Sequence, residues 1–473
     1  MDKNSTIPLC VDLDGALIRL DTLHQALFLL LRKSPFSLFR MLGWWAKGRA
    51  FFKDQVMQRV ELDASALPYH LEFLNNLRSQ HAAGRKIILA TAANHRTAKA
   101  VAQHLGIFSE WLGSDAQTNL SGSKKLEAIQ NRFPHFAYAG DSKKDFPIWA
   151  EADEIILVNP SKAAQKKYVA QATQLFEDRK PYWKAIFRAM RPAQWLKNIL
   201  VFAPLFLAHQ FANPHLLLQA ALAFCSFGFA ASSIYLLNDL FDLSADQHHP
   251  RKCTRPFASG DLPIAAGLFL VPLFMLLSLL FATPLSVGFL WVLLTYYFIT
   301  TLYSWRIKQI PLLDVFVLAI LYIMRILAGS AATGVPTSKW FIAFSLTLFL
   351  SLALLKRFAE MREISKSNSP EKVRHERGYR TTHLQPLFWI GTLSGSSSVL
   401  VLALYANSSV AHQLYAHPAR LWLLCPLLFY WILRVWKLAK CGKMYDDPVA
   451  FAIRDPQTYL LGCVALLWLF FAI

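Results

Sequence analysis

Acidic residues are scarce in this sequence. Only 30 Asp and Glu stand against 49 Lys and Arg among 473 residues, which gives a formal net charge of +19. A positive surplus of this size favours anionic partners, either nucleic acids or acidic lipids and phosphorylated substrates. No nucleic-acid recognition motif accompanies the charge, so we expect no nucleic-acid partner and attribute the surplus to contacts with a lipid bilayer and with phosphate groups.

Cysteine is also sparse and follows no pattern. The six cysteines lack C-x-x-C spacing and nearby histidine pairs, so neither a disulfide framework nor a zinc site is indicated. An apolar signal segment is missing at the start, where MDKNSTIPLCVDLDG runs directly into a strand pattern. We therefore expect the amino-terminal part to remain in the cytoplasm.

Long apolar runs, by contrast, are abundant, with 55% hydrophobic residues and 14 Trp. A chain of this length is too long for one compact core. Charged and apolar residues are interspersed up to residue 195, whereas from Leu196 onward apolar runs of roughly 17 to 22 residues recur, the length that spans a bilayer as a helix. Nine spans are predicted, at 196–212, 216–237, 264–282, 285–303, 312–330, 340–355, 386–405, 420–437 and 458–473.

Positive charge orients these spans, because Lys and Arg in short loops stay on the cytoplasmic side. With the amino terminus inside, the inner loops hold the basic residues of 251–255, 306–308, 356–380 and 434–454, and the outer loops contain only Lys339. We expect an integral protein of the bacterial inner (plasma) membrane with a cytoplasmic front domain. Whether the chain forms a homo-oligomer stays open.

The front domain predicts an α/β doubly wound fold. Four buried strands separated by helical stretches are expected at 7–13, 86–92, 136–139 and 155–158. A parallel sheet of this kind binds ligands at the carboxyl ends of its strands. The polar residues at those ends are Asp12, Asp14, Thr91, Asp141 and Asp145.

A further motif, Gly122-x-x-Lys125, lies between the expected strands at 86–92 and 136–139. Together and in this order, the motifs resemble the haloacid dehalogenase superfamily of phosphotransferases over residues 1–165. The resemblance implies that Asp12 is a nucleophile forming an aspartyl phosphate. It implies that Asp14 protonates the leaving alcohol and then activates water. Thr91 and Lys125 would hold phosphoryl oxygens, with Lys124 as the alternative to Lys125.

The same resemblance implies a Mg²⁺ site, because a carboxylate attacks a phosphate dianion only when cations cancel the repulsion. Its ligands would be Asp12, Asp14, Asp141 and Asp145. A degenerate domain kept for packing or regulation is the alternative.

A helical insertion at about 23–80 would be the cap that selects the substrate of such a domain. Its Trp44, Trp45, Phe51 and Phe52 are interleaved with cations, which is typical of helices at a membrane surface. A plain packing face for the cap is the equal alternative. Residues 166–195 similarly predict a linker and an amphipathic helix on the cytoplasmic leaflet, followed at the first span by Lys197 and Asn198.

The second predicted span ends in an acidic motif, Asn238-Asp239-Leu240-Phe241-Asp242, followed by Asp246. Four-residue spacing stacks carboxylates toward one side of a helix end. Acids this close repel one another unless a cation is present, so Mg²⁺ binding is expected. The next cations, Lys252 and Arg255, can neutralise phosphate oxygens. An ordinary charged loop is the alternative.

Nine spans with this motif after the second resemble the UbiA-type intramembrane prenyltransferase superfamily, which gives an all-α membrane domain at 196–473. The resemblance implies a central cavity with metal-diphosphate chemistry under cytoplasmic loops. The usual second Asp-rich motif is absent, and cations replace it, which suits an extra phosphate better than a neutral aromatic ring. This basic segment contains Lys356, Arg357, Glu360, Lys372, Arg374, Arg377, Tyr379 and Arg380.

Two charged residues inside the fifth predicted span also indicate a site for charged ligands. Asp314 and Arg325 are eleven residues apart and so lie on one helix face. Charges in lipid are costly, so a functional cavity or mutual pairing of the two is expected, with purely structural pairing as the alternative.

Four segments together resemble the decaprenyl-phosphate phosphoribosyltransferase branch more than the aromatic-acceptor branch. They are HHPRKCTRPFASG at 248–260, Asp314 with Arg325, KRFAE at 356–360, and DPVAFAIRD at 447–455. This implies 5-phosphoribosyl 1-diphosphate as donor and a polyprenyl phosphate as acceptor, which displaces pyrophosphate at the anomeric carbon.

In that assignment Mg²⁺ on Asp239, Asp242 and Asp246 would stabilise the departing pyrophosphate, which Lys252 and Arg255 also hold. Lys356, Arg357 and Tyr379 would bind the sugar 5-phosphate or the lipid phosphate, and Glu360 a ribose hydroxyl or a second Mg²⁺.

The fused hydrolase would then remove the 5-phosphate from the product, which makes the chain a bifunctional enzyme for envelope glycan precursors. An aromatic prenyltransferase and a lipid carrier with a regulatory soluble domain are the alternative functions.

Overall fold

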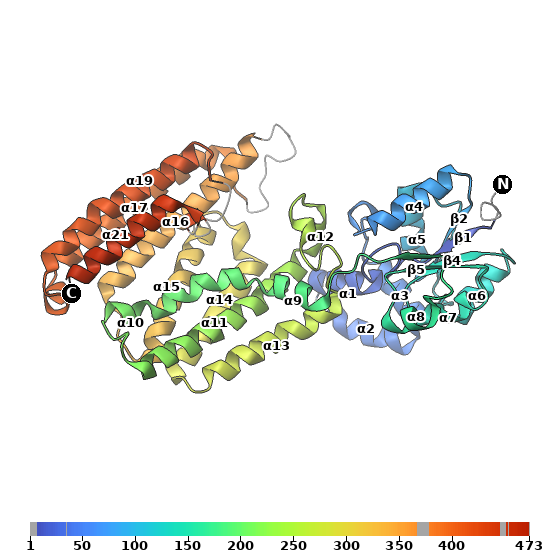
Figure 1. Ribbon diagram of the computed structural model, residues 1–473, viewed down its shortest axis with the longest axis horizontal. Helices are drawn as coiled ribbons and strands as arrows, with labels where there is room; N and C mark the ends of the chain where they lie inside the picture. Colours follow the sequence, from blue (N-terminus) through green and yellow to red (C-terminus); the bar gives the residue numbers. More distant parts are fainter. Residues whose placement is uncertain (1–6, 35, 367–377, 445–450, 453, 473) are drawn as a thin grey trace. The chain divides into compact units, whose positions relative to one another are not determined.

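The computed structural model describes residues 7–34, 36–366, 378–444, 451–452 and 454–472. The chain divides into two compact units (Figure 1). The first unit consists of Met1–Met190 and Tyr235–Val271, and the second of Arg191–Ile234 and Pro272–Ile473. The acidic motif therefore belongs to the same unit as the front domain.

The front domain is built on a six-stranded parallel sheet with the order β3-β2-β1-β4-β5-β6. The strands are β1 (Leu9–Val11), β2 (Ile87–Asn94), β3 (Glu110–Ser114), β4 (Ala137–Gly140), β5 (Glu154–Val158) and β6 (Gln174–Phe176). Strand order reverses between β1 and β4, and such a reversal opens a ligand crevice at the carboxyl ends of these two strands. β3 and β6 were not predicted, and β6 places part of the predicted 166–195 linker inside the sheet.

Helices cover both faces of this sheet. They are α4 (Leu71–Ala82), α5 (His95–Leu105), α6 (Ser123–Gln130), α7 (Phe146–Trp149) and α8 (Lys162–Tyr168). Because side chains alternate along a strand, Leu9 and Val11 of β1 pack in one cluster with Phe73, while Cys10 packs on the opposite face with Trp149. The parallel sheet is thus buried on both sides, as expected for a doubly wound fold.

Three short helices form the cap, α1 (Thr22–Lys33), α2 (Ser37–Ala46) and α3 (Arg49–Met57). Ala26, Leu30, Phe52, Val56 and Met57 give it a small core of its own. Phe52 is therefore a packing residue and not one of the aromatic residues available to a membrane. The last part of the predicted 23–80 insertion is α4, which packs on the sheet.

Among the described residues, seven helices are long and apolar enough to cross a membrane. Six are α11 (Pro214–Phe241), α13 (Ile264–Ala282), α14 (Val287–Trp305), α15 (Leu313–Thr333), α16 (Lys339–Lys366) and α17 (Leu384–Ala406), and the seventh joins η9 (Pro418–Leu423) to α19 (Leu424–Lys440). A shorter apolar helix, α21 (Pro456–Ala472), follows. These helices mark the chain as an integral membrane protein.

The prediction of nine spans is not confirmed, and the first of them, 196–212, is not one helix. It consists of the 3₁₀ segment η4 (Pro192–Phe202) and the five-residue α10 (Ala203–Leu207). Pro204 has no N–H to donate to a continuous helix, and His209 has a positive φ of 56°, which an α-helix does not accommodate.

The remaining elements are short. They are α9 (Tyr182–Met190), α12 (Leu243–His248), α18 (Ser409–Leu414), η2 (Ala64–Ala66), η3 (Lys143–Asp145), η5 (Lys252–Thr254), η6 (Ile307–Gln309) and η8 (Thr381–His383).

Small residues allow close helix packing in the second unit. A Cβ added at Gly329 of α15 would collide with the carbonyl group of Val201 in η4. In the same way Gly391 of α17 receives the ring of Trp436 from α19, whose Nε1 donates to Ser351 Oγ of α16 at 3.1 Å.

Gly329→Ala should therefore lower the thermal midpoint of the detergent-solubilised protein, because the backbone of Val201 cannot move aside without displacing η4. Overpacking of this kind costs about 1–3 kcal/mol. The matched control is Gly462→Ala in α21, where an added Cβ meets nothing within 4 Å. Equal midpoints for the two variants would contradict the packing described for η4.

Candidate active sites

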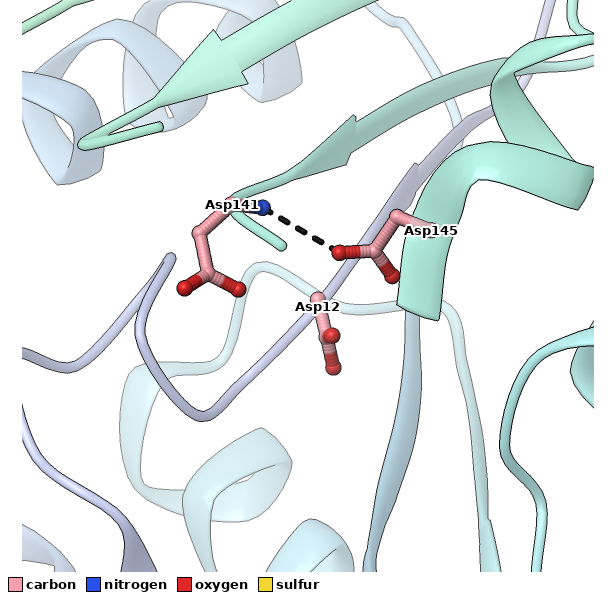
Figure 2. A group of neighbouring side chains, drawn as sticks. All are labelled: Asp12, Asp141 and Asp145. Carbon is pink, nitrogen blue, oxygen red and sulfur yellow. Dashed lines mark hydrogen bonds between the residues drawn. The ribbon is translucent and has the colours of Figure 1, made fainter. Parts of the chain in front are cut away.

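Three carboxylates meet at the crevice of the sheet. Asp12 follows β1, and Asp141 and Asp145 follow β4; each offers an oxygen within 4.8 Å of the others. Figure 2 shows the three side chains converging, with the backbone N–H of Asp141 donating to Asp145 at 3.3 Å. Within the described residues no other group of three Asp, Glu, His or Cys side chains is this close. Hard oxygen ligands in this arrangement fit Mg²⁺.

A single buried cation neutralises this cluster. Lys125 Nζ donates to Asp12 Oδ2 at 2.8 Å and to the hydroxyl of Tyr138 at 2.8 Å, and it lies 3.5 Å from Asp145 Oδ1. Lys125 is buried at the start of α6, whereas Lys124 is exposed. Of the two lysines left open by the sequence, the structure brings Lys125 to the carboxylates.

Asp145 fixes the loop that carries Asp141. Its carboxylate accepts from the N–H of Ser142 at 3.0 Å and from the Tyr138 hydroxyl at 2.8 Å. The Asp141 carboxylate lies directly over Gly15, which has a φ of +84°; a Cβ there would be 2.5 Å from Asp141 Oδ2. Gly15 is thus required both for its backbone conformation and for the space that Asp141 occupies.

Asp14 lies outside the three-carboxylate group. Its oxygens accept from the N–H and the hydroxyl of Thr22, at 3.1 and 3.2 Å, where the cap begins. Burial, together with the charges of Asp21 and Asp12, raises the pKa of Asp14 to about 8. A carboxyl group with this pKa is protonated at neutral pH, which is the state that a general acid needs.

The cap contributes a lysine that the sequence did not single out. Thr91 is buried within β2, which continues to Asn94, and its hydroxyl accepts from the N–H of Ala93 at 3.0 Å. Beside it, Lys53 Nζ of α3 donates to the Ala92 carbonyl at 2.8 Å and to Asn119 Oδ1 at 2.6 Å. The only sequence signal was the basic composition of the insertion, which does not tell one lysine from another.

The acidic motif forms a second site around one arginine. Arg255 Nη1 donates to Asp239 Oδ1 at 3.1 Å and to Asp246 Oδ2 at 2.7 Å, and both acids are buried. The structure thus brings at least two of the three predicted ligands to one cation, and the third, Asp242, is half-buried. The guanidinium supplies the neutralisation that clustered acids require.

Lys252 and Asn238 are the other residues predicted for this site. Lys252 begins η5 and is half-buried. The Oδ1 of Asn238 is buried without a hydrogen-bond partner among the described residues. A buried oxygen in this state is suited to a bound cation or a hydrogen-bond donor of a ligand, so the donor set fits Mg²⁺ or a hydrated diphosphate.

A third cation-carboxylate group lies in the second unit. Arg357 Nε of α16 donates to Asp314 Oδ2 at 2.6 Å, and its other nitrogens donate to Glu360 at 2.5 Å and to the Tyr303 hydroxyl at 3.2 Å. Tyr379 donates to Asp314 Oδ1 at 2.5 Å. Asp314, which was predicted separately, therefore forms one network with three residues of the predicted basic segment, Arg357, Glu360 and Tyr379.

Mutual pairing, one of the two interpretations given for Asp314 and Arg325, is not what the structure shows, because Asp314 pairs with Arg357. Arg325 Nε donates instead to Asn198 Oδ1 at 2.9 Å, and Nη2 to the Tyr296 hydroxyl at 3.1 Å. The physical reason is that eleven residues of helix cover about 16 Å along the axis, so two side chains on one face remain too far apart to touch.

For most of the remaining predicted residues the structure gives burial alone or no description. Lys197 in η4 and Lys356 in α16 are half-buried. Lys372, Arg374, Arg377 and residues 447–450 and 453 of the predicted DPVAFAIRD segment lie outside the described residues. Asp455, which ends that segment, pairs with Arg434 at 2.7 Å.

An apolar cavity of about 1080 Å³ lies within the second unit. Its lining includes Leu207, Phe344, Leu402, Leu428 and Leu461, which come from five different helices. A hydrocarbon chain is the ligand that such a lining favours.

The model describing the UbiA prenyltransferase family matches residues 199–453, which is more than half of the chain. The uncharacterized protein y4nM of Sinorhizobium fredii is 35% identical over 465 residues, which cover 97% of this chain and 89% of that protein. This alignment includes the front domain as well as the membrane helices.

Two further relatives match parts of the chain. Nodulation protein NoeC of Azorhizobium caulinodans is 33% identical over 59% of this chain and 92% of its own length. A decaprenyl-phosphate phosphoribosyltransferase of Corynebacterium glutamicum is 31% identical over 49% of this chain and 70% of its own length. Among solved structures, a UbiA homolog from Archaeoglobus fulgidus bound to GPP and Mg²⁺ matches at 18% identity and a TM-score of 0.46, over 60% of this chain and 96% of its own.

Mg²⁺ should stabilise the protein more at about pH 8.5 than at about pH 6. Burial and the nearby Asp145 and Asp12 raise the pKa of Asp141 from 3.8 to about 8. The folded protein therefore holds a proton that the unfolded chain releases, so this contribution to stability is complete below about pH 4 and is lost as the pH rises through 8. Mg²⁺ takes the place of that proton and binds more tightly once it has left. Thermal midpoints with and without Mg²⁺ test this.

Asp141→Asn should reduce the Mg²⁺-dependent shift of the midpoint, because the amide is a weaker ligand. Glu127→Gln, an exposed acid of the same domain, is the matched control and should keep the full shift. An unchanged shift in Asp141→Asn would place the stabilising ion elsewhere.

Gly15→Ala should reduce the Mg²⁺-dependent shift of the thermal midpoint, since its methyl group displaces Asp141. Gly84→Ala carries the same kind of backbone strain, at a φ of +88°, but its Cβ meets nothing within 4 Å. The two variants separate displacement of the carboxylate from strain. Equal shifts in the two variants would contradict the role given to the position of Asp141.

Proposed function

Because this chain belongs to the UbiA prenyltransferase family, we propose that its membrane domain is a transferase that moves 5-phosphoribose from 5-phosphoribosyl 1-diphosphate to a polyprenyl phosphate, with release of pyrophosphate. Support comes from the similarity to decaprenyl-phosphate phosphoribosyltransferases. The apolar cavity supports a polyprenyl ligand as well.

Arg357 is the observation that carries this choice of donor. It is a buried cation in the basic segment that stands where a second acidic motif is usual. A guanidinium has five N–H donors, and its contacts with Asp314, Glu360 and Tyr303 use three of them. The remaining donors of this fixed side chain are suited to phosphate oxygens, which a neutral aromatic acceptor lacks.

At the acidic motif, Mg²⁺ held by Asp239, Asp246 and Asp242 would supply charge neutralisation for a diphosphate. Arg255 and Lys252 bind the non-bridging oxygens of the same diphosphate. Arg255 already lies between the two buried acids, so a diphosphate meets a preorganised cation there. Displacement at the anomeric carbon forms the bond to the lipid phosphate oxygen and breaks the bond to pyrophosphate.

The front domain then acts as a phosphatase on the lipid-linked product. The Asp12 carboxylate attacks phosphorus, the bond from phosphorus to the ribose oxygen breaks, and Asp14 gives its proton to that oxygen. Asp14 next takes a proton from the water that attacks the aspartyl phosphate, which releases inorganic phosphate. Lys125, Thr91 and Lys53 hold the phosphoryl oxygens. The final lipid, polyprenyl-phosphoryl-ribose, is a precursor for envelope glycans.

Membranes that contain the wild-type chain should convert 5-phosphoribosyl 1-diphosphate and polyprenyl phosphate, with Mg²⁺, into polyprenyl-phosphoryl-ribose. Asp12→Asn should instead accumulate the form that retains the 5-phosphate, and Asp239→Asn should form neither. Mass spectrometry of extracted lipids distinguishes the three results.

Two outcomes would contradict the proposal. A product without its 5-phosphate from Asp12→Asn would remove the phosphatase assignment. Transfer of a labelled prenyl group to an aromatic acid, without any ribosylated lipid, would remove the choice of donor and acceptor and leave the general transferase assignment.

A further inference from the structure

Helix α2 of the cap turns an apolar face to solvent. Phe36, Leu38, Phe39, Leu42 and Trp45 are each between 51% and 78% exposed. Leu38, Leu42 and Trp45 follow one another at helical spacing and so form one stripe. On a soluble domain, large apolar side chains grouped in this way mark an interaction surface.

The opposite side of α2 packs against the rest of the cap. Met41 and Trp44 pack against the cap core, and Arg59 lies over the Trp44 ring at 4.4 Å. Trp44 therefore stabilises the cap, whereas Trp45 faces outward. Of the aromatic residues predicted to contact a membrane, Trp45 lies on the exposed face, whereas Trp44 and Phe52 pack inside the cap.

The charged residues around this apolar face are all positive. No Asp or Glu occurs between Leu31 and Lys53. The exposed cations of the segment are Arg32, Lys33, Arg40, Lys47 and Arg49. An apolar stripe flanked by cations is complementary to an anionic lipid surface.

Contacts within the first unit place the preceding helix beside the end of the span α11 and beside α12. The ring of Phe28 in α1 is 6.1 Å from that of Phe241, the last residue of the span α11. Gln25 Nε2 of α1 donates to Gln247 Oε1 of α12 at 2.9 Å. Helix α2 begins four residues after α1 ends, so it follows these contacts closely along the chain.

We propose that α2 inserts this face into the anionic leaflet of the bilayer that the chain itself spans, on the side of the front domain. The lipid contact holds the cap against the membrane surface, where it can meet a phosphate group carried by a lipid. Contact with lipid is independent of the reaction proposed above. A second copy of the chain is a poorer occupant, because two faces that each carry five exposed cations repel one another.

Leu42 and Leu71 provide a matched pair for the test, because each is 66% exposed. The full-length protein, with p-benzoylphenylalanine at position 42 or at position 71, is placed in vesicles of phosphatidylglycerol and phosphatidylcholine and illuminated. Position 42 should form several-fold more lipid adduct than position 71. Vesicles of phosphatidylcholine alone should reduce the adduct at position 42.

Equal lipid adducts at the two positions, a yield independent of phosphatidylglycerol, or crosslinks to a second copy or another protein would overturn the proposal. A functional arm, which rests on the proposed phosphatase, uses Leu42→Glu with Leu71→Glu as control. Leu42→Glu should slow hydrolysis of the lipid-linked phosphate several-fold and leave that of p-nitrophenyl phosphate unchanged. If lipid crosslinking holds and neither hydrolysis is detected, the proposed function fails and the membrane contact stands.

Discussion

Neutralisation of buried carboxylates by a single cation organises all three polar sites of this protein. Lys125 stands between Asp12 and Asp145, Arg255 between Asp239 and Asp246, and Arg357 between Asp314 and Glu360. A buried acid without such a partner would lose the solvation of its charge with nothing in return. The first and third of these sites join elements far apart in sequence, Lys125 with Asp12 and Arg357 with Asp314, whereas the second lies within residues 239–255.

The same constraint explains why these sites suit phosphate chemistry. A phosphate group brings negative charge to carboxylates, which is tolerable only where cations are already fixed in place. In the front domain the cluster of Asp12, Asp141 and Asp145 adds a donor set for a divalent ion. In the second unit Arg357 lies within the long helix α16 and is held by Asp314, Glu360 and Tyr303, so its remaining N–H groups are oriented before a ligand arrives.

The acidic motif belongs to the same compact unit as the front domain. Residues 235–271 belong to the unit of the front domain, and the contacts of Asp63 with His248 and of Arg188 with Asp261, each at 2.7 Å, join the two segments. The helical cap contacts the sheet through Lys53, which donates to the Ala92 carbonyl, and it contacts α12, after the acidic motif, through Gln25 and Gln247. In the bifunctional enzyme that we propose, such a connection would raise the effective concentration of one site for the product of the other.

Local patterns in the sequence were enough to predict the acids at the strand ends and the acidic motif, because strand ends and residues one helical turn apart can be read from periodicity. Lys125 was preferred over Lys124 on the family resemblance. The doubly wound sheet followed from the same periodicity. The partner of Arg325, the role of Lys53, the inward Phe52 beside the outward Trp45, and the break at Pro204 were decided by tertiary packing. Periodicity specifies which side of an element a residue occupies; which residue of another element meets it depends on how the elements pack, and that information is not local.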